Sequence, residues 1–263
     1  MLIFVSETDQ GGPVTRHLDV AESVRTHGFQ SVNTLAAMFG VDISTIRRDL
    51  ERLETMGLIE RTHGGAIPVT HPETPTQVRA SLHREEKIAI GKAMAERVLD
   101  GQTIILAAGT TTLEVARHLN QEGVTVVTND LRIGMEVADR QKMHLVFIGG
   151  DLLPNDYRMW GPTAVQQLSN LRVDVAIFGA DTVSEEGIFS VSSYGIELNR
   201  VMMSIAREAF FVADSSKFGR EALFKVFGFE EFTAGITDSL LDPLRASRFP
   251  VPVIQVSPEP TRR

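Results

Sequence analysis

The chain has 263 residues, of which 43% are hydrophobic, enough to bury a sizeable core in one large domain or two ordinary ones. It contains no cysteine, which excludes a disulfide framework, thiolate zinc sites and a cysteine nucleophile, and which suits a reducing compartment. The net charge of −8 and a pI near 5.4 exclude a uniformly basic nucleic-acid-binding protein, so any DNA contact must come from a local patch.

The start of the chain predicts neither secretion nor membrane insertion. Its apolar run, residues 1–5, is too short for the core of a signal peptide, and no basic segment precedes it. No stretch approaches the roughly 20 apolar residues of a spanning helix. We therefore expect residues 1–13 to be disordered and the protein to be cytoplasmic, with no membrane partner.

Residues 14–67 predict a small module of three helices and a hairpin. Apolar residues recur at helical spacing in three stripes. The stripes are Val20, Ala21 and Val24, then Val32, Leu35, Ala36 and Phe39, then Ile46, Leu50 and Leu53. A break at residues 40–42 precedes the third stripe, where Asp42 can cap the following helix.

The third helix presents the chemistry of a major-groove reader. With its apolar stripe turned toward the core, the opposite face and its shoulders carry hydroxyls and arginines. Arginine forks bind guanine edges, and hydroxyls and cations bind phosphates. The candidate DNA contacts on this helix are Ser44, Thr45, Arg47, Arg48 and Arg52.

Residues 57–66 predict a small hairpin, or wing. Arg61 and His63 lie beside two glycines, so backbone and charge can approach a phosphate closely, and both join the candidate DNA contacts. Six Lys and Arg residues stand against seven Asp and Glu within 14–67, so the module as a whole is not basic. Periodicity alone therefore leaves DNA binding and an ordinary solvated helix face equally open.

These residues resemble the N-terminal signature of the DeoR family of bacterial transcription regulators. The runs LAAMFGVDISTIRRDL at 35–50 and RTHGGA at 61–66 stand at the family spacing. The resemblance covers most of residues 14–67 and implies a winged helix-turn-helix domain that reads operator DNA. Asp42 stands where the family usually has Ser, which adds a negative charge near the DNA.

Residues 68–84 carry three prolines and predict a semi-rigid linker. From 85 to 263 apolar strand patterns alternate with helical ones, which predicts an α/β domain with a mainly parallel sheet and flanking helices. The predicted strands are 103–106, 124–127, 144–148, 173–178, 210–213, 235–237 and 253–256. The predicted helices are 87–99, 112–120, 131–139, 163–170 and 197–208.

Polar residues at the strand ends predict a ligand site in this domain, because open α/β sheets bind ligands at the carboxyl ends of their strands. Gly109 leads into a helix N-terminus that can bind an anion, although helix capping explains such a loop equally well. Lys217 can supply charge to a phosphate, while Asp181 and Asn129 can read sugar hydroxyls; Asn129 alone is more often a turn residue. The candidates are Gly109, Thr110, Thr111, Thr112, Thr128, Asn129, Gly149, Gly150, Asp181 and Lys217.

Residues 84–240 resemble the sensor domain of the same family, which is similar in fold to ribose-5-phosphate isomerase and the CoA-transferase superfamily and binds phosphorylated sugars. The resemblance carries ligand contact onto the same candidates and adds Glu197. Asn199 stands where Lys is usual, which leaves Arg200 as the nearby cation, and Ala107 stands where Asp is common. An altered ligand and a degenerate sensor both remain open.

The preferred hypothesis is a repressor of a carbohydrate-catabolism operon. It is a homodimer or homotetramer on double-stranded operator DNA, released by a phosphorylated sugar or polyol effector. The alternative is a sugar-phosphate isomerase-like enzyme with a DNA-binding appendage, which is disfavoured because Thr182 follows Asp181 where that pattern commonly has an acid. A third hypothesis, a purely structural module, would leave the arginines of the third helix unexplained. No cofactor and no metal site are predicted.

Overall fold

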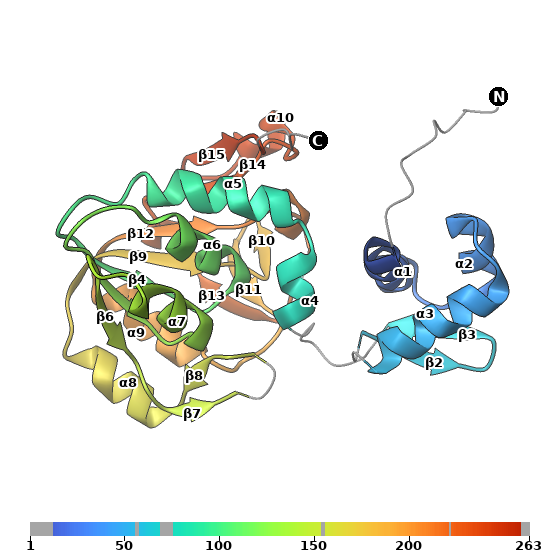
Figure 1. The fold of residues 1–263 in the computed structure, drawn as a ribbon. Coiled ribbons are helices and arrows are strands. Elements are labelled where there is room, and N and C mark those ends of the chain that lie inside the picture. Colours follow the sequence, from blue (N-terminus) through green and yellow to red (C-terminus); the bar gives the residue numbers. More distant parts are fainter. Residues whose placement is uncertain (1–12, 56–57, 69–75, 154–155, 221, 259–263) are drawn as a thin grey trace. The chain divides into compact units, whose positions relative to one another are not determined.

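The computed structural model describes residues 13–55, 58–68, 76–153, 156–220 and 222–258 (Figure 1). The chain divides into two compact units, Met1–Val78 and Arg79–Arg263. Residues 1–12, most of the segment predicted to be disordered, lie outside the described residues. Within the described residues, every helix is too short or too polar to span a lipid bilayer.

The first unit is a winged helix-turn-helix, as predicted. Its helices are α1 (Pro13–His27), α2 (Val32–Phe39) and α3 (Ile43–Thr55), and its strands are β1 (Gln30–Ser31), β2 (Ile59–Thr62) and β3 (Gly65–Pro68). The strands form an antiparallel sheet in the order β1-β3-β2, and β2 and β3 make the wing.

The three predicted apolar stripes meet in the core of this unit. Val20 and Val24 of α1, Leu35 of α2, and Ile46 and Leu50 of α3 are all buried together. The turn between α2 and α3 is made at Gly40, whose φ of 63° lies in the left-handed region that favours glycine. The packing of one apolar face from each helix therefore fixes which side of α3 faces solvent.

The second unit is built on a parallel sheet in the order β15-β14-β12-β9-β4-β5-β6, which confirms the α/β class. Its strands are β4 (Thr103–Leu106), β5 (Thr125–Thr128), β6 (His144–Phe147), β9 (Val173–Gly179), β12 (Ala206–Val212), β14 (Ala234–Asp238) and β15 (Val253–Val256). Its helices are α5 (Arg84–Ala95), α6 (Thr110–His118), α7 (Leu131–Ala138), α8 (Pro162–Ser169), α9 (Ile196–Ser204) and α10 (Pro243–Ala246).

Helices cover both faces of this sheet, so successive strand residues enter different cores (Figure 1). Ile104 and Leu106 of β4 pack with residues of α5, α6 and α7, whereas Ile105 between them packs with residues of α8 and α9. Burial on both faces explains the near-continuous apolar runs in the sequence.

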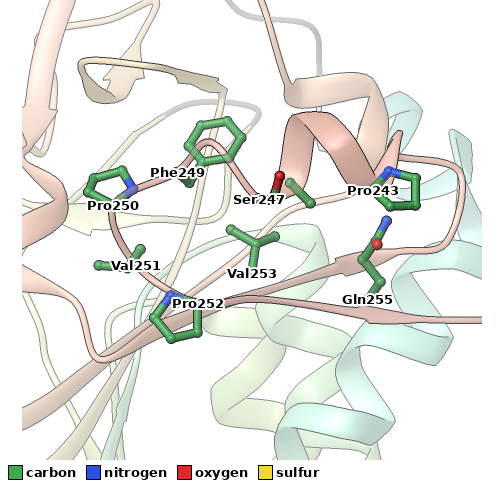
Figure 2. A pocket seen from close by; sticks show the side chains of 9 residues that line it. Pro243, Ser247, Phe249, Pro250, Val251, Pro252, Val253 and Gln255 are labelled. Atoms are coloured by element: carbon green, nitrogen blue, oxygen red, sulfur yellow. The ribbon is translucent and has the colours of Figure 1, made fainter.

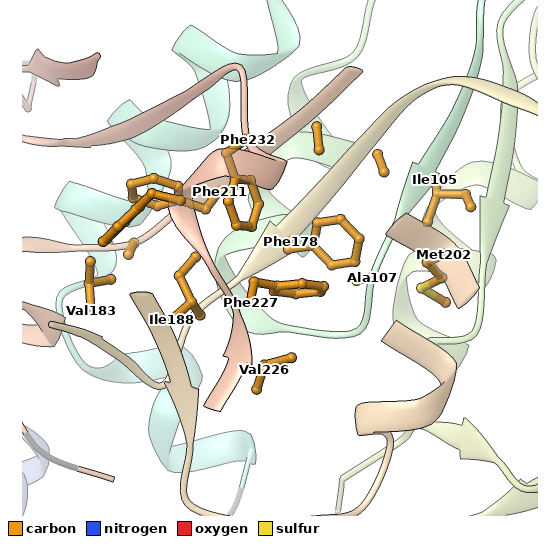
Figure 3. Close-up of a cluster of buried hydrophobic side chains, with 14 of the residues drawn as sticks. Ile105, Ala107, Phe178, Val183, Ile188, Met202, Phe211, Val226, Phe227 and Phe232 are labelled. Atoms are coloured by element: carbon orange, nitrogen blue, oxygen red, sulfur yellow. The ribbon is translucent and has the colours of Figure 1, made fainter. Parts of the chain in front are cut away.

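A group of phenylalanines belongs to the core that contains Ile105 and extends it beyond the sheet (Figure 3). The ring of Phe178 lies 4.8 Å from that of Phe227, and Phe232 stands edge-on to Phe227 at 5.4 Å. Phe227 belongs to a small antiparallel sheet, β10-β11-β13, that the sequence patterns did not predict. Its strands are β10 (Thr182–Ser184), β11 (Gly187–Ser190) and β13 (Phe224–Phe227).

The structure corrects two further expectations. The helix predicted over 197–208 ends at Ser204, because Ala206 and Glu208 pair with Val173 and Val175 as the start of β12. The interval predicted as a linker, 68–84, contains a helix, α4 (Thr76–Ser81). The hairpin of β7 (Asp151–Leu152) and β8 (Met159–Trp160) and the short 3₁₀ turns η1 (Ser215–Lys217) and η2 (Phe229–Glu231) complete the unit.

Candidate functional site

Helix α3 turns one face inward and presents its cations to solvent. Ile46, Leu50 and Leu53 are fully buried, while Arg47 and Arg48 are exposed. Ser44 and Arg52 are also exposed and Thr45 is half-buried, so the helix candidates lie on the accessible side as predicted. A fixed helix with exposed guanidinium groups is the arrangement that major-groove recognition requires.

A buried ion pair, which the sequence patterns did not single out, fixes α3 against α1. Asp49 is only 3% exposed. Its carboxylate accepts hydrogen bonds from Arg16 Nε at 2.7 Å and lies 2.8 Å from His17 Nε2. The bond to Asp49 raises the pKa of the Arg16 guanidinium. The signal was present in the sequence, because Asp49 falls three residues after Ile46 on the apolar stripe.

The first turn of α3 is capped by Asp42, as predicted. The Thr45 amide donates to Asp42 Oδ1 at 2.9 Å, and the hydroxyls of Ser44 and Thr45 donate to the same carboxylate at 2.6 and 2.9 Å. These hydrogen bonds hold the pKa of the Asp42 carboxyl well below its usual range. Both candidate hydroxyls therefore point at a fixed negative charge, and a DNA phosphate would have to compete with it.

In the wing, Arg61 contacts acidic residues of α3. Its Nη1 lies 3.4 Å from Glu51 Oε1 and 3.7 Å from Glu54 Oε2, and its amide donates to Glu54. His63, next to the turn, is exposed. Arg61 therefore holds the wing against α3, and its use on DNA, which stays a prediction, requires an exchange of partners.

In the second unit the strand order reverses between β4 and β9, since β5 and β6 extend from one side of β4 while β9, β12 and β14 follow on the other. A crevice at such a reversal is where open α/β sheets bind ligands. The predicted residues Gly109 and Asp181 follow these two strands. Asp214, which follows the neighbouring strand β12, lies at the same edge of the sheet.

The loop after β4 is held by internal hydrogen bonds. Thr112 is fully buried, and its hydroxyl donates to the carbonyls of Ala107 and Gly109 at 2.7 and 3.1 Å. The Gly109 amide donates to Asp130 Oδ2 at 3.3 Å, and the Thr128 hydroxyl donates to the Leu106 carbonyl at 2.8 Å. The side chains of Thr112 and Thr128 thus shape the turn, and a carboxylate already lies at the start of α6. Thr111 is buried and Thr110 half-buried on the same helix.

Asn129 remains the candidate best placed to read a hydroxyl. It is 1% exposed and its Nδ2 donates to the Met159 carbonyl at 2.8 Å. Its Oδ1 is buried and has no hydrogen-bond partner in the described part of the chain. A buried acceptor without a donor is costly unless something supplies one.

The two glycines after β6 make contacts within the chain. The Gly149 amide donates to Gln167 Oε1 at 3.0 Å. A Cβ on Gly150 would lie 2.3 Å from the Trp160 carbonyl, so the β7–β8 hairpin requires glycine there. Trp160 itself packs edge-on against Tyr194 at 5.2 Å. Ligand contact by these glycines stays a prediction.

Charged side chains gather near Asp181. Asp181 accepts from the Ser190 hydroxyl at 2.8 Å and lies 3.9 Å from Arg79 Nη1. Arg79 also donates to Asp156 Oδ1 at 2.5 Å, and Arg158 Nε donates to the other oxygen of Asp156 at 2.7 Å.

Two lysines, one buried and one half-buried, belong to the same group of charges. Lys87 is 4% exposed, and burial lowers its pKa to about 8 although Asp214 opposes that shift. Burial also lowers the pKa of Lys217, with Asp214 and Asp181 opposing. Lys217 thus belongs to the same group of charges as Lys87, and its contact with a ligand phosphate stays a prediction.

The candidates on α9 lie in other surroundings. Glu197 is exposed in its first turn. Arg200 Nη1 lies 3.6 Å from Glu231 Oε1, and its guanidinium lies over the Phe227 ring at 5.7 Å. Their ligand contact was inferred from resemblance and stays a prediction.

Sequence reasoning missed Arg79, Lys87 and Asp130. Lys87 left a signal, because it shares an apolar helix stripe with Ile90 and Met94. Arg79 left none, since it lies in the predicted linker and its partner Asp156 is 77 residues away.

A pocket of about 390 Å³ lies elsewhere, between α10 and β15 (Figure 2). Its lining is Pro243, Ala246, Ser247, Phe249, Pro250, Val251, Pro252, Val253 and Gln255. This lining holds neither a charged side chain nor any predicted ligand residue, so we assign no function to it.

Comparison with known proteins places both units in one family. Residues 16–71 match the family model "DeoR-like helix-turn-helix domain", and residues 82–239 match "DeoR C terminal sensor domain". The chain is 32% identical over 229 residues to the transcriptional repressor AccR of Agrobacterium fabrum, covering 85% of this chain and 89% of that protein. It is 31% identical over 227 residues to the glycerol-3-phosphate regulon repressor of Escherichia coli, covering 85% and 90%.

Solved structures give weaker likenesses. Ribose 5-phosphate isomerase A of Methanocaldococcus jannaschii is 21% identical with a TM-score of 0.36, covering 50% of this chain and 53% of that one. The sorbitol operon regulator SorC of Klebsiella pneumoniae is 14% identical with a TM-score of 0.33, covering 79% and 90%. Scores this low carry no argument about function.

Proposed function

Because the chain belongs to the DeoR family of DNA-binding transcription regulators, we propose that it represses a carbohydrate-catabolism operon and that a phosphorylated sugar or polyol releases it. The family and these relatives are regulators and not enzymes, so the isomerase alternative is not retained. The observation that carries the proposal is the solvent-exposed arginine face of α3 on a helix whose other face is buried.

The DNA contacts of this proposal come from α3 and the wing. Arg47, Arg48 and Arg52 supply guanidinium groups for bases and phosphates, with Ser44, Thr45 and His63 as further donors. Arg61 contributes once DNA phosphates replace Glu51 and Glu54 as its partners. A regulator that meets chromosomal DNA in this way works in the cytoplasm.

The effector site of this proposal lies at the carboxyl edge of the parallel sheet. Lys217 and Arg79 supply positive charge there, while Asn129 Oδ1 and Asp181 accept hydrogen bonds from hydroxyl groups. A ligand with one phosphate and several hydroxyls satisfies both requirements. The name of the Escherichia coli relative, a glycerol-3-phosphate regulon repressor, points to the same class.

We propose a homodimer or homotetramer, because regulators of this kind place two recognition helices on successive half-sites. The effector acts by binding the DNA-incompetent arrangement more tightly than the DNA-competent one. A ligand with equal affinity for both arrangements would release nothing.

The test uses fluorescence anisotropy with a labelled duplex from the promoter of the chain's own gene and a scrambled duplex of equal length. We expect tight, salt-dependent binding to the promoter alone, weakened at least tenfold by one of glycerol 3-phosphate, glucose 6-phosphate and ribose 5-phosphate. Equal affinity for both duplexes would contradict the proposal that the protein recognises operator DNA. A phosphate ester that raises the melting temperature of the protein without changing its affinity for the promoter duplex would contradict release by an effector.

A further inference from the structure

Glu51 is an acidic residue on the exposed face of α3. At about 100° per residue, Ser44, Arg48 and Glu51 fall within about 60° of arc on one side of the helix. All three are exposed, whereas Leu53 on the opposite side is fully buried. Arg48 Nη2 donates to Ser44 Oγ at 3.4 Å, so neighbouring turns of this stripe lie against each other. The face proposed to enter the major groove therefore carries a carboxylate.

Glu51 lies close enough to the start of α3 to reach a base. It stands seven positions after Ser44, which is about 10 Å along the helix axis, or about two turns. Recognition helices of DNA-binding domains contact bases over about two turns. The Glu51 side chain is 60% exposed, so its carboxylate is accessible to a base edge.

The wing lies beside this carboxylate. Arg61 of β2 places its Nη1 3.4 Å from Glu51 Oε1, and this positive charge reduces the repulsion between Glu51 and the DNA backbone. A carboxylate offers about four acceptor sites. A base can therefore donate to Glu51 whether Arg61 stays in place or moves to a phosphate.

The base edges in the major groove determine which base can donate to a carboxylate. Guanine presents two acceptors there, and thymine presents an acceptor and a methyl group, so neither donates. Adenine presents an amino group beside the acceptor N7, which repels a carboxylate oxygen. Cytosine presents only its N4 amino group. A carboxylate on a recognition helix therefore favours cytosine over the other three bases.

We infer that Glu51 is a specificity-determining residue that accepts a hydrogen bond from N4 of a cytosine in the operator. This inference deepens the proposed function and rests on it, because it requires α3 to lie in the major groove. A carboxylate near phosphates weakens binding to every sequence, and a cytosine at the right position offsets that repulsion. Glu51 thus selects the operator partly by rejecting other duplexes.

Glu54 offers a matched control, because it also contacts Arg61 but lies to the side of the stripe. Its Oε2 lies 3.7 Å from Arg61 Nη1, and its Oε1 accepts from the Arg61 amide at 3.3 Å. At about 100° per residue it lies about 120° around the helix from Arg48. A neutral side chain at Glu54 removes the same charge from beside Arg61 and leaves the stripe of Ser44, Arg48 and Glu51 intact.

The test determines the base preference of the full chain at each operator position. Duplexes with a randomised segment are selected on the wild type and on each variant, and anisotropy then measures affinity for the selected duplex and its single-base variants. We expect the wild type to prefer cytosine at one position about tenfold over guanine or thymine. In Glu51→Gln the preference there should change to adenine, because an amide donates to N7 and accepts from N6. Glu51→Ala should reduce the preference to within about twofold.

Loss of the charge and loss of the base contact have separate readouts. Glu51→Gln and Glu54→Gln should both bind a scrambled duplex about threefold more tightly, because each removes one negative charge near the DNA backbone. Only Glu54→Gln should keep the preference for cytosine. An unchanged preference in Glu51→Gln, or the same change of preference in Glu54→Gln, overturns the inference and leaves the proposed function standing. A wild type without a base preference at any position overturns both.

Discussion

The positive charges of the two candidate sites lie in opposite surroundings. Arg47 and Arg48 of α3 are exposed to water, whereas Lys87 of the second unit is buried and Lys217 is half-buried. Exposed guanidinium groups remain charged at any physiological pH and attract a polyanion over a distance that salt shortens. Buried ammonium groups lose hydration and regain it only from a specific partner. On the proposed function, the same charge thus serves long-range attraction to DNA in one unit and selection of a small anion in the other.

Removing the exposed charges of α3 should have the largest effect and tests this comparison most directly. We expect the double variant Arg47→Ala/Arg48→Ala to lose operator affinity by about a thousandfold, or about 4 kcal/mol, because each base contact contributes about 1–3 kcal/mol. The slope of log affinity against log salt should fall by up to about 2 if both residues also neutralise phosphates. Anisotropy titrations over a range of salt concentrations measure both quantities.

The control for this double variant is Arg172→Ala/Arg207→Ala, which removes two exposed arginines from the second unit. It should change neither affinity nor slope. Duplex binding and a salt slope that survive loss of Arg47 and Arg48 would show that α3 does not lie in a groove.

A buried charge pair and an exposed one can be compared on α3 itself. Asp49→Ala leaves Arg16 and His17 without their buried partner and should lower the free energy of unfolding of the first unit by about 3 kcal/mol. Glu51→Ala removes an exposed partner of Arg61 and should cost less than about 1 kcal/mol. Urea unfolding followed by circular dichroism gives both values, and equal costs would contradict the contrast.

The buried lysine makes stability depend on pH. Burial lowers the pKa of Lys87 to about 8 in the folded chain, below its ordinary value of 10.5. Between these two values the unfolded chain binds more protons, so stability rises with pH. We expect the stability of the wild type relative to Lys87→Met to increase by about 2 kcal/mol from pH 7.5 to pH 10.

The difference between the two proteins is the quantity to follow in urea titrations. Lys217, whose pKa burial also lowers, contributes in the same direction to both and largely cancels. A difference that stays flat over this range, or that falls, would mean that burial does not lower the pKa of Lys87 in the folded chain.

The sequence predicted elements well where local pattern decided them. The three apolar stripes of the first unit and the runs that became β4, β5 and β9 depend on which residues face a core, and periodicity reports that directly. The end of α9 was placed wrongly because Ala206 and Glu208 favour a helix locally, and only pairing with β9 makes them strand.

The site was harder to predict for a similar reason. Lys217 and Asp181 were selected as candidates because they follow strands whose ends must meet, and Asp42 was predicted correctly as a cap because it stands directly before a helix. Arg79 could not be found, since its role depends on Asp156 and Asp181, which only the folded chain brings near. The composition of the segment 68–84 predicted a linker, and it could not show that one arginine in it would pair with two aspartates.

The smallest expected effect concerns Asp42, the acidic residue that caps the recognition helix. Asp42→Ser keeps a capping hydroxyl for the Thr45 amide but removes a negative charge and frees the Ser44 and Thr45 hydroxyls to reach a phosphate. Operator affinity should therefore rise about threefold, with a slightly steeper salt slope and an unchanged unfolding midpoint. Asp42→Asn serves as the control, because it removes the charge yet keeps an acceptor at the same place; affinity should rise in it as well. Weaker binding by both variants would show that the position of the Ser44 and Thr45 hydroxyls, fixed by Asp42, matters more to recognition than the repulsion between the carboxylate and the DNA backbone.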